Sequence, residues 1–269
     1  SNPYIPATAL NQICGSVGIS GADCSAAAAA TDPDDAAYLE QNINYARRFV
    51  ELGPRLNERQ TRVWQFKTGA RGNLSDDLAW DIFYATGESD LRSQQSGNGT
   101  RSRLTQAVQA TSTTECLDSS GGCVPINLWG PLGSISPEVG QFLDVGNGGR
   151  TFTELEQIQA FVSGDLPFSM PTVDLPVSGV FGYEFREYVG GLTNDLLSQT
   201  PGEVLGNGAA APNRFGTYDV NEYFFEANVP VLQGASLAEE LTIQAGVRLS
   251  DYSTTGEETT WKIGGTWSP

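Results

Sequence analysis

The residues of this chain whose chemistry could make them catalytic are closely spaced carboxylates. Glu154 with Glu156, and Glu184 with Glu187, could in principle act on glycosidic bonds. The chain has no histidine, the commonest general base, and no Gly-x-Ser-x-Gly motif, phosphate loop or dinucleotide fingerprint. We therefore expect no catalytic residue and no enzyme activity, and we interpret the acidic pairs as parts of strand faces.

Four cysteines form two local pairs, Cys14 with Cys24 and Cys116 with Cys123, each among Gly, Ser and Asp residues. Close pairs in polar loops predict disulfides and an oxidising compartment, and free thiols are the alternative. Neither spacing is Cys-x-x-Cys, and no histidine is present, so zinc is disfavoured. We expect no metal and no cofactor.

Charge and composition narrow the class of protein. The 269 residues include 15 Lys and Arg against 32 Asp and Glu, which gives a net charge of −17. Phosphate binding needs a basic surface, so no nucleic-acid partner is expected. No apolar run approaches the roughly 18 residues of a membrane-spanning helix. A β-barrel remains possible, because each membrane-spanning strand of a barrel shows only alternation and no long apolar run.

Alternation with a period of two residues is the strongest structural signal. In 241–252 one side of the predicted strand is apolar and the other carries Arg248, and in 259–267 Trp261 and Lys262 fall on opposite sides in the same way. Aromatics near strand ends and cations in mid-strand are typical of the lipid-facing and lumen-facing sides of an outer-membrane barrel.

Seven strands follow from this pattern, at 59–71, 78–88, 154–165, 177–188, 217–232, 241–252 and 259–267. Their connections alternate in length, with long ones at 91–150 and 189–216. Outer-membrane barrels show the same alternation, with short turns on the periplasmic side and long loops on the extracellular side. Single-chain bacterial barrels have an even number of strands, so the odd number predicts part of a larger barrel.

The predicted fold class is all-β, with antiparallel up-and-down strands that form a segment of a transmembrane β-barrel. Residues 1–58 are expected to be an extracellular loop region, irregular over 1–41, and residues 59–269 a partial barrel. Short helices are predicted in the outer loops at 34–42, 101–110 and 136–145. The acidic cluster at 32–35 is interpreted as the start of the first helix, since it lacks the ligand spacing of a calcium loop.

Five segments carry short motifs in a consistent order, namely 47–55 (RRFVELGPR), 122–130 (GCVPINLWG), 134–138 (SISPE), 218–230 (YDVNEYFFEANVP) and 248–264. Together they resemble the middle of the barrel of TonB-dependent outer-membrane receptors, in a branch with long extracellular loops. The resemblance covers most of residues 44–269. Each motif alone is short, and their combination is specific.

The resemblance implies energised uptake of a scarce nutrient across the outer membrane of a Gram-negative bacterium. In that family the ligand binds the extracellular loops, and TonB pulls on a plug domain inside a barrel of about 22 strands. The implied partners are the TonB complex, acting through a plug, outer-membrane lipid, and a small-molecule or oligosaccharide ligand. No plug and no TonB box are recognisable, so we expect a barrel segment without its plug. Carbohydrates, iron chelates and cobalamin-like molecules are all compatible ligands, and aromatics and amides in the loops favour carbohydrate.

Charged residues on the inward side of the alternation are expected to line the lumen and face the plug. They are Lys67, Arg71, Asp81, Glu184, Arg186, Glu222, Glu226, Arg248 and Lys262. A register shift of one residue would place them in lipid, at about 2–4 kcal/mol for each Arg or Lys at the midplane. The alternative is the solvated face of a soluble sheet.

Candidate ligand-binding residues lie in the outer loops, and they are Trp129, Asn127, Arg47, Arg48, Arg55, Tyr4 and Tyr38. Aromatics and amides suit sugars, whereas arginines suit an anionic chelate or a carboxylate. The alternative is that these residues only hold the loops together.

A soluble secreted or surface β-sandwich that acts as a binding module is the second hypothesis. The two hypotheses differ in the environment of one set of side chains, which are Trp64, Phe66, Trp80, Tyr84, Phe181, Tyr183, Phe185, Tyr223, Phe225, Trp261 and Trp267. A barrel exposes this aromatic set to lipid, whereas a sandwich buries it between two sheets.

Overall fold

The computed structural model describes residues 2–236 and 238–269, and the chain divides into two compact units. The loop unit comprises Ser1–Gln60, Arg92–Gly149 and Thr193–Asn213. The sheet unit comprises Thr61–Leu91, Arg150–Leu192 and Arg214–Pro269. Each unit therefore collects segments that are far apart in the sequence.

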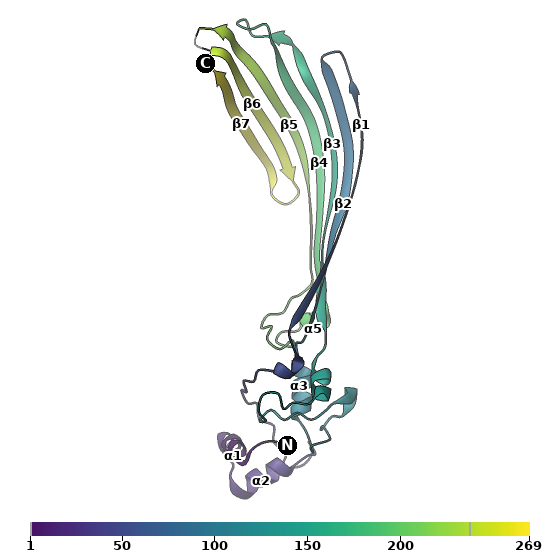
Figure 1. Cartoon of the computed structure of the whole chain (residues 1–269), viewed down its shortest axis with the longest axis vertical. Helices are drawn as coiled ribbons and strands as arrows, with labels where there is room; N and C mark the ends of the chain where they lie inside the picture. Colours follow the sequence, from purple (N-terminus) through teal and green to yellow (C-terminus); the bar gives the residue numbers. More distant parts are fainter. Residues whose placement is uncertain (1, 237) are drawn as a thin grey trace. The chain divides into compact units, whose positions relative to one another are not determined.

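Seven strands form one sheet in the order β1-β2-β3-β4-β5-β6-β7, so sequential strands are neighbours (Figure 1). Their bounds are β1 Leu56–Asn73, β2 Leu78–Ser96, β3 Asn147–Ser169, β4 Pro176–Asn194, β5 Arg214–Ala235, β6 Ala238–Tyr252 and β7 Gly256–Ser268. The predicted all-β architecture of antiparallel up-and-down strands is confirmed. Among the described residues, β1 and β7 are the edges of an open sheet.

Each strand is longer than its alternation predicted. The strand expected at 154–165 spans 23 residues as β3, and the one expected at 78–88 spans 19 residues as β2. The apolar pattern stops earlier than the strand does, because backbone pairing continues through polar residues that have no apolar face to signal it. A membrane-spanning strand needs about 9–11 residues, so these strands are longer than a bilayer requires.

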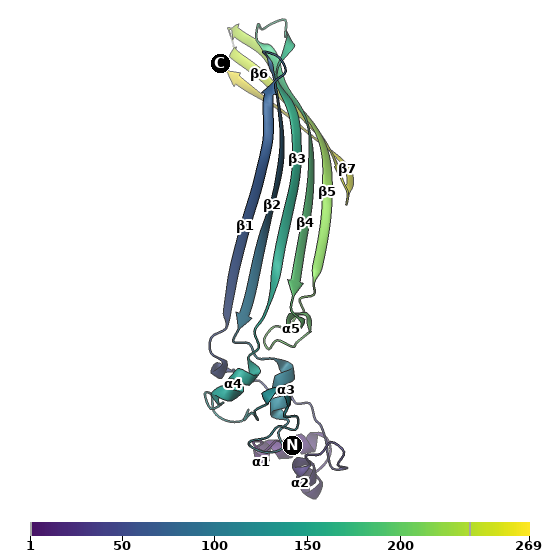
Figure 2. The same cartoon turned by 90° about the vertical axis from the view of Figure 1, so that its right-hand side faces the viewer.

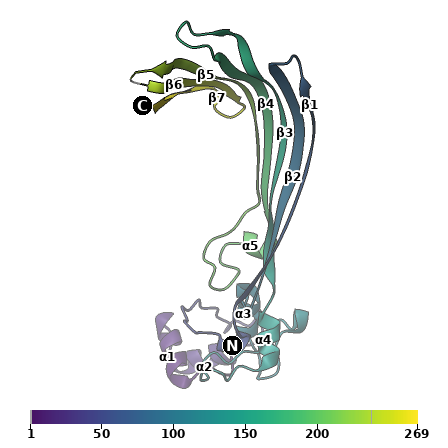
Figure 3. The ribbon, with the colours of Figure 1, turned by 45° about the horizontal axis from the view of Figure 1, so that its top comes forward.

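The pairing register sorts the side chains of β4, β5 and β6 onto two faces. Tyr183 lies opposite Tyr223, and Tyr223 lies opposite Leu249, whereas Glu184 and Glu222 form the adjacent pair and point to the other side. The sheet is twisted and curved (Figures 2 and 3), as the right-handed twist of its strands requires. A shift in the β5–β6 register follows Pro230, whose ring nitrogen cannot donate to the ladder.

One glycine of β3 is required by the turn between β1 and β2. The Ser75 hydroxyl accepts hydrogen bonds from the backbone N–H groups of Asp77 (3.3 Å) and Leu78 (3.1 Å), which closes this turn. Gly164 lies against the turn with φ of 148°, and a Cβ at that position would collide with the Asp77 carbonyl oxygen. Only glycine meets both conditions without strain.

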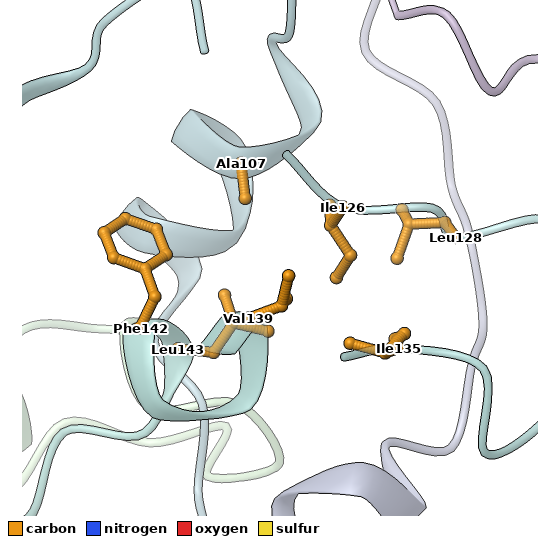
Figure 4. Close-up of a cluster of buried hydrophobic side chains, with 7 residues drawn as sticks. All are labelled: Ala107, Ile126, Leu128, Ile135, Val139, Phe142 and Leu143. Atoms are coloured by element: carbon orange, nitrogen blue, oxygen red, sulfur yellow. The ribbon is translucent and has the colours of Figure 1, made fainter. Parts of the chain in front are cut away.

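Among its described residues, the loop unit contains five short α-helices, and two of them contribute to a small core. The five helices are α1 Ala7–Ser16, α2 Gly21–Ala29, α3 Arg101–Val108, α4 Pro137–Leu143 and α5 Leu196–Gln199. Figure 4 shows the core, in which α3 and α4 pack with the segment between them through the side chains of Ala107, Ile126, Leu128, Ile135, Val139, Phe142 and Leu143. Ile126 and Leu143 are completely buried.

Two predictions for the N-terminal segment were wrong. Residues 1–41 contain α1 and α2 instead of continuous loop, and residues 34–42 form no helix. In α1 and just beyond it, Leu10, Ile13, Cys14 and Val17 recur at helical spacing, a signal that the loop interpretation missed. At 32–37 the Asp32 and Asp35 carboxylates accept hydrogen bonds from the backbone N–H groups two residues later, and such turns compete with a helix.

The two cysteine pairs lie in the loop unit. Cys14 is joined to Cys24, which links α1 to α2, and Cys116 is joined to Cys123. These are the pairs that the sequence predicts. Within the described ranges, no helix is both long enough and apolar enough to cross a membrane.

Candidate functional site

The polar face of the sheet carries a buried ionic network centred on Glu222. Its carboxylate accepts hydrogen bonds from Arg186 (2.5 Å), Arg248 (3.2 Å) and the Ser250 hydroxyl (2.6 Å). The side chain is only 2% exposed. Register produces this network, because Glu222 lies opposite Ser250 while Phe224, two residues on and therefore on the same face, lies opposite Arg248.

Glu184 extends the network toward β3. It lies 3.2 Å from the Arg186 guanidinium, and its two carboxylate oxygens accept hydrogen bonds from Gln157 (2.7 Å) and Gln159 (3.0 Å). Two buried carboxylates are thus neutralised by two arginines and capped by neutral amides and a hydroxyl. Such a face is polar and ordered before any partner arrives, which suits it to contact a second polar surface.

The other predicted lumen residues lie at varying distances from this network. Lys262 pairs with Glu226 at 2.8 Å, and both side chains are largely exposed. The Lys67 ammonium lies 3.6 Å from the centre of the Phe83 ring. Arg71 and Asp81 share the strand faces of Lys67 and Phe83 and are not buried.

Contacts between strands show that this polar face is continuous from β1 to β5. Lys67 meets Phe83 from β1 to β2, and Gln157 meets Glu184 from β3 to β4. On the opposite face, Arg150 of β3 pairs with Glu88 of β2 at 2.9 Å. Side chains alternate along each strand, so the odd-numbered Phe83 of β2 and Gln157 of β3 share the polar face. The charged residues expected on the lumen side therefore share one face of the sheet.

The opposite face is apolar and open to the surroundings. Seven of the predicted aromatic set are strongly exposed, from 42% for Phe225 to 76% for Trp261, and the full group is Trp64, Phe66, Phe181, Tyr223, Phe225, Trp261 and Trp267. Trp80, Tyr84, Tyr183 and Phe185 are half-buried. No second layer covers this face within the described residues, contrary to what a sandwich requires.

Charges return to the apolar face near the strand ends that lead into the long loops and the short β6–β7 turn. Glu187 lies opposite Asp219, and Asp251 lies opposite Glu257. Glu88 and Asp90 bind Arg150 on the same face. The apolar band therefore has a polar border on its loop side.

Two of the predicted ligand-binding residues are held by contacts within the loop unit. The Arg47 guanidinium donates to the carbonyls of Gly130 (2.6 Å) and Pro131 (3.0 Å) and to Glu51 (2.7 Å), and its side chain is 5% exposed. The Asn127 side-chain oxygen accepts from the backbone N–H groups of Trp129 and Gly130. Both side chains fix the 127–131 turn, a role for which the sequence offered no separate signal.

Protonation of Glu51 is tied to this turn. Burial acts to raise the pKa of the Glu51 carboxyl, but hydrogen bonds from its own backbone, from Arg47 and from the Gly133 N–H outweigh burial and hold the pKa below its ordinary value. The ionised carboxylate therefore stabilises the folded loop.

A cavity of about 1430 Å³ lies within the loop unit. Of the predicted ligand residues, Arg47, Arg48, Arg55, Tyr38 and Trp129 line it, whereas Asn127 and Tyr4 are not among its lining residues. The Tyr4 hydroxyl instead donates to the Thr113 carbonyl at 3.2 Å.

Two tyrosines shape the wall of this cavity. Tyr45 was missed by sequence reasoning, although its ring lies 5.8 Å from that of Trp129 and its hydroxyl donates to the Leu128 carbonyl. Burial and the neighbouring Glu40 carboxylate raise the pKa of Tyr38, which donates to that carboxylate at 2.9 Å. Tyr38 is therefore neutral at physiological pH.

Comparison with known proteins adds one match. The model of a protein family described as TonB dependent receptor-like, beta-barrel matches residues 23–269. No curated protein and no solved structure matches the chain. The matched range includes every strand of the sheet and most of the loop unit, and α1 lies outside it.

Replacing Glu222 by Gln should destabilise the sheet. The change removes the negative charge that Arg186 and Arg248 share, and we expect a loss of about 1–3 kcal/mol in the free energy of unfolding. Urea unfolding in detergent, followed by circular dichroism, measures it. Glu226→Gln is the matched control, because Glu226 is 47% exposed and its pair with Lys262 contributes about 0–1 kcal/mol. Equal effects of the two variants would contradict the network.

Acid should loosen the loop unit through Glu51. Because its pKa is lowered in the folded state, the stabilisation is complete above the ordinary glutamate pKa of about 4.3 and is lost as the pH falls through the lower folded pKa. In a variant that keeps Trp129 as its only tryptophan, fluorescence-detected urea unfolding should show this loss. Glu51→Gln should weaken the pH dependence without removing it, because the pKa values of Asp118 and Glu138 are also lowered, whereas the exposed Glu58→Gln should leave it unchanged.

Proposed function

This chain belongs to the TonB-dependent receptor-like β-barrel family, and we propose that it recognises a scarce nutrient and takes it up through the outer membrane with energy supplied by TonB. The family consists of receptors and transporters rather than enzymes, and its members typically lie in the outer membrane. The nutrient is a carbohydrate or an iron chelate. Residues 1–58 and the loops at 91–150 and 189–216 form the extracellular part that binds it.

The observation that carries this proposal is the sheet with one uncovered aromatic face and one ionic face. An exposed band with Trp261 (76%) and Trp267 (62%) would be unfavourable in water, whereas lipid makes it stable. The polar border at Glu187 and Asp219 marks the extracellular limit of the band. A soluble β-sandwich is disfavoured because it would bury the same side chains.

The ionic face is the surface that a plug domain would meet. A plug that moves during transport needs polar contacts that break without leaving a buried charge unpaired. Glu222 and Glu184 already have their partners on the barrel wall, in Arg186 and Arg248. Release of the plug therefore exposes neutralised groups, while Lys67, Arg71, Asp81, Glu226 and Lys262 supply the more accessible charges.

A pair of neighbouring substitutions in β6 tests the membrane assignment. Ile243→Arg places a charge on the apolar face and should cost about 2–4 kcal/mol of membrane-inserted stability. Gln244→Arg, one residue away on the polar face, should be tolerated. Unfolding in lipid vesicles and the yield of inserted protein measure both effects. A soluble, monodisperse protein without detergent, or equal tolerance of the two variants, would contradict the barrel.

Uptake is tested in cells that produce the full-length receptor, with and without TonB. Radiolabelled ferric chelates and radiolabelled oligosaccharides are offered separately at low concentration. We expect one class to accumulate only when both receptor and TonB are present. Accumulation that is independent of TonB would refute energised transport and leave the chain as a passive pore or a receptor.

A further inference from the structure

The loop-unit cavity has an unusual concentration of exposed apolar side chains. Within residues 2–55, the large hydrophobic side chains that are strongly exposed are Val17, Leu39, Ile43, Tyr45 and Val50. All five line this cavity, together with buried or half-buried neighbours such as Leu52, Leu104 and Leu128. An apolar surface gathered around one hollow is best covered by an apolar ligand.

The cations of the cavity differ in their availability. Arg47 is neutralised by Glu51, and its two terminal nitrogens donate to backbone carbonyls and to that carboxylate. Arg48 and Arg55 also line the cavity, both are exposed, and no carboxylate in the described ranges forms an ion pair with either.

The remaining charged groups of the cavity do not cancel these two arginines. Glu40 is the one carboxylate among the described lining residues, and it accepts hydrogen bonds from Tyr38 (2.9 Å) and Gln109 (3.3 Å). Glu51 binds Arg47 and the Gly133 N–H instead. Arg48 and Arg55 therefore keep guanidinium donors for an external anion, and guanidinium groups match carboxylates in a two-pronged geometry.

From these observations we propose that, of the two nutrient classes, the cavity binds the iron chelate, through an amphipathic carboxylate ligand with a bulky apolar body, in preference to a neutral sugar. The volume of about 1430 Å³ exceeds the usual 300–1000 Å³ of small-molecule pockets, so the body is large. The walls expose more apolar than polar surface, and aliphatic side chains such as Leu39, Ile43 and Val50 would contact the apolar body, while the two arginines favour an anion over a neutral sugar. The proposal rests on the proposed function and defines the ligand class of the same site.

The experiment uses a matched pair of fluorescent probes, 11-(dansylamino)undecanoic acid and its uncharged methyl ester. Full-length protein that keeps Trp129 as its only tryptophan is placed in lipid nanodiscs, and energy transfer from Trp129 to the dansyl group reports binding at the cavity. We expect the acid to bind at least about tenfold more tightly than the ester. Replacing both Arg48 and Arg55 by Gln should abolish this preference while leaving ester binding unchanged.

Controls separate the possible failures. Arg62→Gln removes an exposed arginine that does not line the cavity, and it should keep the preference for the acid. Equal binding of acid and ester, or a preference that survives in the double variant, would overturn the anion assignment. No energy transfer from Trp129 with either probe would overturn the cavity as the site. Both results leave the transporter proposal standing, because TonB-dependent uptake is measured separately in cells.

Discussion

The alternation of side chains across one antiparallel register is the constraint on which the rest of this molecule depends. Because Glu222 must face Ser250 and Arg186 while Tyr223 faces Leu249, a single sheet separates an ionic surface from an apolar one. A slip of one residue would exchange the two surfaces and leave two buried carboxylates without cations. The register is thus specified twice, by the ion pairs on one face and by the apolar side chains gathered on the other.

The loop unit is stabilised differently, because its connecting segments are not held by strand pairing in the sheet. It is stabilised by a small apolar core around Ile126 and Leu143, by two disulfides between close cysteines, and by Arg47, which holds the 128–131 carbonyls. These devices are short in range. They leave a large hollow between the N-terminal helices and the core, which is the proposed site of ligand recognition.

The sequence predicted the sheet better than the loops, and the reason is physical. Alternation is a direct consequence of strand geometry, so the sequence pattern predicts the seven strands and the face on which each side chain lies. It does not predict the strand ends, because polar residues such as those of 147–153 can extend a ladder without an apolar pattern. In the loops, Arg47 and Asn127 were assigned to ligand by residue type alone. Only the fold reveals that their hydrogen-bonding groups are used by the 127–131 turn.

The acidic pairs at the border of the apolar band imply an unusual response to counterions. Glu187 faces Asp219 and Asp251 faces Glu257, so like charges lie directly opposite each other across neighbouring strands. Such pairs repel, and the repulsion between exposed charges is screened over about 10 Å at 0.1 M salt. At this border, dissolved ions therefore strengthen the sheet, whereas for the exposed Lys262–Glu226 pair they weaken it. A rise in salt concentration therefore has opposite effects on the stability contributed by the charge pairs of the two faces of the sheet.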